Sequence, residues 1–332
     1  MASSFIASLG VVKKEIVIYF VIPMFIMSII GGCLSLIVFL SLKTFRQSSC
    51  AFYLTIKSAY DVGLTIESML PFFMRWGFGM DWGLPSLFFC KTRNSMATVF
   101  SLGSMTCLCL AVIDQYFSTS SRIHWQKWCN IKLAHRLTAI FTIIWILQGI
   151  PYVVFYNHII SPTTNTTACQ ITNEKFSEYL VYGYYFTISN LLPIISIIFG
   201  SMAYHNARHL THRTVPVVRR ELDKQLTGMV LVEVLINFCT VLPFSIVYML
   251  SNITAASSDP VFQAKISFAS SITLMFSYLG RASPFYTYIC VSQRFRQQLN
   301  FHLYDLYLNK YSKKYHHLYN NIVFSESNQI IP

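Results

Sequence analysis

An uncharged run of about twenty residues, from Asn94 to Ile113, constrains this chain more than any other feature. At 1.5 Å per residue, a helix of that length crosses about 30 Å of hydrocarbon. Small residues lie among the Leu, Met and Val of the run, so neighbouring helices can approach it closely. The sequence therefore predicts a membrane-spanning helix. Cys90 precedes this run and Asp114 follows it directly.

The rest of the composition agrees with a membrane protein. Of the 332 residues, 54% are hydrophobic and only 11% are charged. The formal net charge of +12 comes from basic residues scattered between apolar runs, a distribution that reports membrane topology. We therefore expect a membrane lipid environment and no nucleic-acid partner.

The apolar runs predict seven spanning helices, which together form a membrane domain over residues 15–290 after a short extracellular N-terminus, residues 1–14. The second run carries Lys57, Asp61 and Glu67 and is the least apolar, so a non-spanning assignment stays open for it. A basic and apolar pattern over residues 291–307 predicts an amphipathic helix 8 on the inner surface, and the polar tail, residues 308–332, is expected to be disordered. The seven expected spans are about 15–42, 51–75, 90–116, 133–156, 180–204, 225–250 and 264–290.

The positive-inside rule selects the orientation with the N-terminus outside. In that orientation the inner segments hold most of the basic residues: Lys43, Arg46, Arg122, Lys127, Lys132, Arg136, Arg208, Arg213, Arg219, Arg220, Lys224, Arg294, Arg296, Lys310, Lys313 and Lys314. The outer segments hold only Lys13, Lys14, Arg75, Lys91, Arg93, Lys175 and Lys265. The same orientation places two glycosylation sequons outside, at Asn165 and Asn252.

The motifs on these spans resemble those of rhodopsin-like (class A) G-protein-coupled receptors. In that family the third helix begins at a disulfide Cys and ends in Asp-Arg-Tyr, and here Cys90 and Asp114-Gln115-Tyr116 have the same spacing. The resemblance covers roughly residues 31–303, and the ends of the spans are similar to divergent invertebrate neuropeptide receptors. The remaining matching positions, each on the expected span or loop, are Asp61, Trp145, Cys169, Pro193, Pro243 and Pro284.

This resemblance implies an all-α, seven-transmembrane helix bundle at the plasma membrane. Its partners would be an extracellular ligand and a heterotrimeric G protein, and it would be neither an enzyme nor a protein with a cofactor or metal. It also implies a disulfide between Cys90 and Cys169, which are the cysteines in outer segments, where oxidation is possible.

The expected activation switch departs from the family. Gln115 replaces the third-helix Arg, and Val241 replaces the sixth-helix Trp two residues before Pro243. In the seventh helix Ser283 replaces the Asn before Pro284, and Thr287 replaces the Tyr three residues after it, so four switch positions are substituted. We infer a G-protein-coupled receptor with a non-standard switch. A decoy or dimer-partner receptor that does not couple stays open, whereas a transporter or channel would need internal repeats or a continuous polar path, and no repeat is seen.

Residues near the expected mouth favour a peptide ligand with an acidic group or a C-terminal carboxylate, because Arg presents a bidentate fork to carboxylates. A biogenic amine is not expected, since aminergic receptors carry an Asp where this chain has Ala97. It stays open that the basic residues contact only headgroups and water. The candidate ligand residues are Arg75, Lys91, Arg93, Ala97, Gln170, Glu178 and Tyr182.

Four charges, Lys57, Asp61, Glu233 and Arg281, fall within the predicted spans. Each costs about 2.5 to 3.5 kcal/mol to insert, so partners are expected. The family often holds a sodium ion beside this Asp, with Ser104 as a further ligand; whether one binds here stays open. We infer that Arg281 takes the place of the ion and that a Lys57 to Glu233 bridge holds the sixth helix closed. A charge exchange between Lys57 and Glu233 should then restore the bridge, unless the two cations extend past lipid to the membrane surface.

Overall fold

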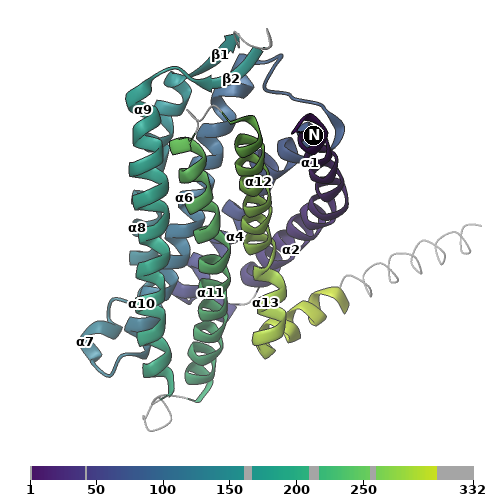
Figure 1. The fold of residues 1–332 in the computed structure, drawn as a ribbon. Coiled ribbons are helices and arrows are strands. Elements are labelled where there is room, and N and C mark those ends of the chain that lie inside the picture. Colours follow the sequence, from purple (N-terminus) through teal and green to yellow (C-terminus); the bar gives the residue numbers. More distant parts are fainter. Residues whose placement is uncertain (1, 42, 161–166, 209–216, 255–258, 305–332) are drawn as a thin grey trace, which may run out of the picture.

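The uncharged run lies in α6 (Leu87–Thr119), at the centre of a bundle of long helices (Figure 1). The computed structural model describes residues 2–41, 43–160, 167–208, 217–254 and 259–304. Helix α6 packs against α4 (Ser49–Leu64), α8 (Ile131–Phe155), α10 (Ser189–Arg208) and α11 (Val217–Ile253). In its most apolar stretch 67% of α6 is buried, compared with 17% of α8, so α6 is the core helix and α8 a peripheral one.

The first long helix begins earlier than the sequence analysis expects. Helix α1 (Ala2–Ile16), a wide π-helical turn (Val17–Val21) and α2 (Ile22–Ser41) are continuous, so residues 2–14 are helical rather than a separate segment. The ammonium nitrogen of Lys13 lies 3.1 Å from the centroid of the Trp76 ring. This cation–π contact connects the early part of the helix to the end of α5 (Leu70–Phe78).

Two of the expected spans are interrupted helices. Helix α4 continues through a π-helical turn (Thr65–Met69) into α5 (Leu70–Phe78), which Gly79 ends with a positive φ of 74°. Helix α12 (Pro260–Ala282) breaks at Ser283 before α13 (Pro284–Val291). Within the described residues, five helices are long and apolar enough to cross a membrane, and polar and charged residues keep α4–α5 and α12 out of that group. The five are Ser4–Ser41, Leu87–Thr119, Ile131–Phe155, Glu174–Arg208 and Asp223–Ile253.

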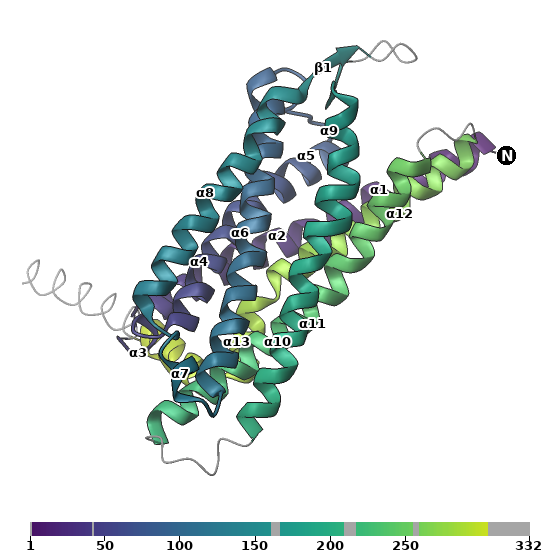
Figure 2. The ribbon, with the colours of Figure 1, turned by 90° about the vertical axis from the view of Figure 1, so that its left-hand side faces the viewer.

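A two-stranded hairpin, which the sequence analysis does not predict, covers one end of the bundle. Strand β1 (Tyr156–Ile160) pairs antiparallel with β2 (Thr167–Ile171), and a short α9 (Glu174–Glu178) and a π-helical stretch (Tyr179–Ile188) lead into α10. The short helices α3 (Lys43–Arg46) and α7 (Ile123–Gln126) lie at the opposite end (Figure 2). We call these the hairpin end and the opposite end.

After α13 a further helix covers residues 293–304. It falls within the range expected for the amphipathic helix 8, residues 291–307, whose position on the inner surface stays a prediction. Residues 305–307 and the tail, 308–332, lie outside the described part of the chain. One face of the helix is buried through Phe295, which is 0% exposed and packs edge-on against Phe39 and Tyr288. The other face leaves Phe301 exposed.

Candidate functional site

A buried ion-pair network crosses the middle of the bundle. The Lys57 ammonium of α4 lies 2.5 Å from a carboxylate oxygen of Asp61, one turn along the same helix, and 2.5 Å from one of Glu233 on α11. These three residues are 1–4% exposed. In a low-dielectric interior such charges persist only when they are paired. The lysine therefore links α4 to α11 through a shared position between two carboxylates.

The remaining oxygens of the two carboxylates are also occupied. The Ser104 hydroxyl of α6 donates to the second oxygen of Asp61 at 2.5 Å, and the Arg281 guanidinium of α12 lies 3.5 Å from that same oxygen. The Tyr288 hydroxyl of α13 donates to Glu233 at 2.6 Å. Two cations and two carboxylates make a formally neutral group, and the structure brings together all four intramembrane charges of the sequence analysis.

The third-helix motif lies near the opposite end, also buried. The Asp114 carboxylate accepts a hydrogen bond from the Ser49 hydroxyl at 2.6 Å. Gln115 is 2% exposed, and its side-chain carbonyl accepts from the Thr227 hydroxyl of α11 at 2.8 Å. That hydroxyl also lies 2.7 Å from the Asp223 carbonyl oxygen. The contact between α6 and α11 at Gln115 is therefore a neutral hydrogen bond.

The other predicted switch residues lie apart from this contact. The Tyr116 ring, partly buried, packs within the aromatic residues at the opposite end. Val241 is buried in α11, four residues before Ser245, whose hydroxyl donates to the Asn190 side-chain carbonyl of α10 at 2.9 Å, and Pro243 also lies inside α11. Ser283 ends α12 and Pro284 begins α13, so these two residues form the break in the seventh helix. The structure does not gather them into one site.

A cavity of about 320 Å³ opens between the helices toward the hairpin end. The described residues of its walls include two guanidinium groups, from Arg93 and Arg281, and no Asp or Glu. Tyrosines supply both rings and hydroxyls to the walls, which suits a ligand with apolar and polar parts. The lining residues are Leu64, Ser68, Phe72, Arg93, Asn94, Ala97, Thr98, Ser101, Met105, Tyr152, Tyr156, Leu180, Tyr184, Tyr185, Ser189, Val241, Phe244, Tyr248, Ser270, Leu274, Ser277, Tyr278 and Arg281.

Of the candidate ligand residues, only Arg93 and Ala97 line this cavity. The Arg75 side chain is 51% exposed and pairs with Asp81 at 3.1 Å outside it. Tyr182 is 56% exposed because the helix turns it away from the bundle. Three further candidates do not line the cavity either: Lys91, Gln170 and Glu178. Of these, Gln170 and Glu178 are exposed on the surface.

Sequence reasoning missed several of the lining residues. Arg281 is the most informative, since the sequence analysis assigns it to Asp61 alone and the structure exposes it to the cavity as well. Tyr152 lies in the last turn of α8 and Tyr156 is the first residue of β1, and their rings stack with centroids 5.9 Å apart. In the expected span, 133–156, their spacing of four residues predicts that both lie on one helix face. That spacing was the available signal for a tyrosine-lined wall.

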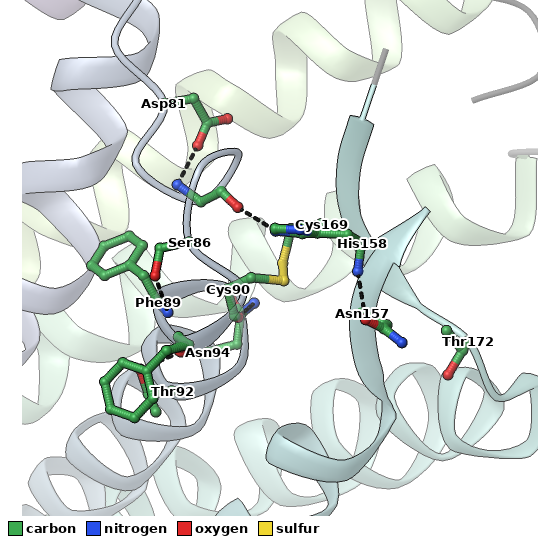
Figure 3. The surroundings of a disulfide bond; sticks show 12 residues. Asp81, Ser86, Phe89, Cys90, Thr92, Asn94, Asn157, His158, Cys169 and Thr172 are labelled. Atoms are coloured by element: carbon green, nitrogen blue, oxygen red, sulfur yellow. Dashed lines mark hydrogen bonds between the residues drawn. A yellow bond between two sulfur atoms is a disulfide. The ribbon is translucent and has the colours of Figure 1, made fainter. Parts of the chain in front are cut away.

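A disulfide joins Cys90, at the start of α6, to Cys169 in β2, with their Cα atoms 5.8 Å apart (Figure 3). In the hairpin register His158 faces Cys169, and its ring nitrogen Nε2 lies 2.7 Å from the Gly83 carbonyl oxygen. The Gly83 amide donates to the Asp81 carboxylate at 2.9 Å (Figure 3). The disulfide and these bonds fix the hairpin over the end of the bundle.

The two sequons differ in what the structure describes. Asn165 lies outside the described residues. Asn252 lies in the last turn of α11, where its amide donates to the Tyr248 carbonyl at 2.8 Å. A glycan would replace one of the two amide hydrogens of Asn252 and leave the other for this bond. Modification there stays a prediction.

Long apolar helices around a central cavity define a multi-pass helical membrane protein. The model of one family, described as 7 transmembrane receptor (rhodopsin family), matches residues 31–281, and the chain therefore belongs to the rhodopsin family of receptors. This is a receptor family and not an enzyme family; an extracellular ligand and a G protein are the partners that membership implies. The comparison with curated proteins gives no match.

Proposed function

We propose that the chain is a plasma-membrane receptor with seven spanning helices that binds a neuropeptide and signals through heterotrimeric G proteins by a non-standard switch. The observation that carries the ligand class is the cavity, whose lining, as far as the chain is described, holds Arg93 and Arg281 but no acidic residue. A bidentate guanidinium favours a carboxylate, such as an acidic side chain or a peptide C-terminus. The similarity of the span ends to invertebrate neuropeptide receptors supports the same class.

We place the hairpin end outside the cell. A disulfide forms in an oxidising compartment, and the Cys90 to Cys169 bond lies at that end. The segments with the greater share of basic residues, including α7 and its flanks, belong to the opposite end, in agreement with the positive-inside rule. In this orientation the helix over 293–304 lies along the inner surface, with Phe295 anchoring it to the bundle.

The proposed switch rests on two contacts that hold α11 against its neighbours. One is the Lys57 to Glu233 ion pair, and the other is the hydrogen bond from Thr227 to Gln115. In the family a third-helix Arg makes the inner contact and a sodium ion sits beside the Asp. We propose that Gln115 replaces the arginine of the family and that Arg281, 3.5 Å from Asp61, replaces the sodium ion.

A screen of surface-expressed receptor against a neuropeptide library, read by G-protein dissociation, tests this function. The library should contain each peptide as the free C-terminal acid and as the amide. Dissociation driven by one peptide class supports the proposal. Binding without dissociation selects the second candidate, a decoy or dimer partner, which the four substituted switch positions favour. No binding of any peptide contradicts the ligand class.

Replacing Gln115 by Arg is expected to raise basal or ligand-driven coupling. The substitution supplies the cation that the family uses at the G protein, and it removes a hydrogen bond to α11 worth about 0.5 to 1.5 kcal/mol, up to roughly tenfold in a two-state equilibrium. The measurement is G-protein dissociation at matched surface expression. Thr227→Ala is the matched control, because it breaks the same bond without adding charge. Equal coupling of Gln115→Arg and the wild type would show that Gln115 does not limit the switch.

A further inference from the structure

Arg281 belongs to the ion-pair network and to the cavity wall at the same time. Its guanidinium donates to the Ser101 hydroxyl at 2.9 Å and lies 3.5 Å from the Asp61 carboxylate, on the network side. Its side chain is nevertheless 11% exposed, and it is one of the cavity lining residues. The cavity therefore reaches the network at this one guanidinium.

Asp61 is held by other groups more closely than by Arg281. The Lys57 ammonium and the Ser104 hydroxyl each lie 2.5 Å from it, one on each carboxylate oxygen. The Arg281 contact, at 3.5 Å, is at the limit of hydrogen bonding. Arg281 is thus the most weakly held charge of the network, and Asp61 keeps a cation and a hydroxyl if Arg281 turns away.

The guanidinium also has donor capacity beyond these two contacts. It carries five N–H groups, whereas the contacts among the described residues involve two of its nitrogens, bound to Ser101 and Asp61. In a low-dielectric site, unpaired N–H donors form strong, charge-assisted hydrogen bonds with a carboxylate, which offers two oxygens. None of the described residues that line the cavity is an Asp or Glu, so a carboxylate that meets these donors from the cavity side would belong to the ligand.

We propose that Arg281 is a ligand-binding residue that takes a carboxylate of the ligand at the inner end of the cavity and leaves Asp61 as it does so. This rests on the proposed receptor function and adds the residue that reads the ligand's charge. Once Arg281 has moved, Lys57 is the cation that stays beside Asp61. The electrostatic attraction between Asp61 and Lys57 then competes more strongly with the ion pair between Lys57 and Glu233. Ligand charge is in this way coupled to the contact between α4 and α11, and the coupling is reciprocal by linkage.

The test uses the purified full-length receptor in phosphatidylcholine nanodiscs and two small probes, N-acetyl-tyrosine and N-acetyl-tyrosinamide. These probes share an aromatic ring that suits the tyrosine walls and differ in the carboxylate. The measurement is the rise in Tm with millimolar probe at fixed ionic strength. For the wild type we expect the acid to bind about tenfold more tightly than the amide, as a charge-assisted pair would give.

Arg281→Gln should remove this preference for the acid, and Arg281→Lys, which keeps the charge but not the fork, should reduce it and serves if the Gln variant does not fold. Arg93→Gln removes the other lining cation, and it should reduce the preference by less than Arg281→Gln does. The proposal is overturned if the wild type does not distinguish the probes, if Arg281→Gln still does, or if Arg93→Gln reduces the preference as much as Arg281→Gln. No G protein or peptide enters this experiment, so its failure leaves the receptor function to the library screen.

Discussion

Replacing Lys57 by Met is expected to lower the stability of the receptor by about 3 to 5 kcal/mol, the usual cost of breaking a buried ion pair from one side. The lysine is 2% exposed and is the close cation of both Asp61 and Glu233. Its loss leaves Glu233 without a cation and Asp61 with only the distant Arg281. The measurements are Tm of the purified receptor and delivery to the cell surface.

Two further variants serve as comparisons for Lys57→Met. Lys57→Arg keeps the charge and should be milder than Lys57→Met. Glu233→Gln leaves Lys57 paired with Asp61, so it should cost less stability but loosen α11 and raise basal activity. Wild-type stability and delivery of Lys57→Met would show that the network contributes nothing to the fold.

The structure changes one expectation about this pair. The sequence analysis expects a Lys57→Glu and Glu233→Lys exchange to restore the bridge. Lys57, however, also pairs with Asp61 one helical turn away. A glutamate at position 57 would face that carboxylate, and Tyr288 would meet an ammonium in place of the carboxylate to which it donates. We therefore expect the exchange variant to stay unstable.

Removing the disulfide is expected to cost about 2 to 5 kcal/mol, because the bond closes a long loop and holds the hairpin on α6. Cys90→Ser and Cys169→Ser should each reduce surface delivery, and the double variant should resemble the single ones. Cys290→Ser is a suitable control, since that cysteine is a free, exposed thiol. Wild-type delivery of both single variants would contradict a stabilising role for the bond.

The sequence was most informative where charge and length decide the structure. The uncharged run fixed α6, and the depth of Lys57 and Glu233 on their spans was enough to expect their contact. The start of the first helix was less predictable. The sequence analysis begins the span at about residue 15, whereas the apolar residues before Lys13 already belong to the helix. The hairpin escaped detection, since each of its strands has only five residues and the first one directly follows the last residue of α8.

The ligand residues were predicted poorly for a different reason. Position along a span sets the depth of a side chain, but the rotation of the helix decides whether it faces the cavity or lipid. Tyr182 and Tyr184 illustrate this, since two residues along the helix change an exposed ring into a cavity wall. Only tertiary packing fixes that rotation. The sequence therefore predicted the end of the bundle at which the cavity lies, but not most of the residues that line it.

The hydrogen bond between Thr227 and Gln115 determines how the contact between α6 and α11 depends on ionic strength and pH. An inner contact made of an arginine and an acid weakens with ionic strength and is lost when the acid takes up a proton. A hydroxyl and an amide have no charge to screen and no proton to gain at physiological pH. The contact between α6 and α11 at Gln115 should therefore hold equally in dilute and concentrated salt and at mildly acidic and neutral pH, so that acid and salt do not open it.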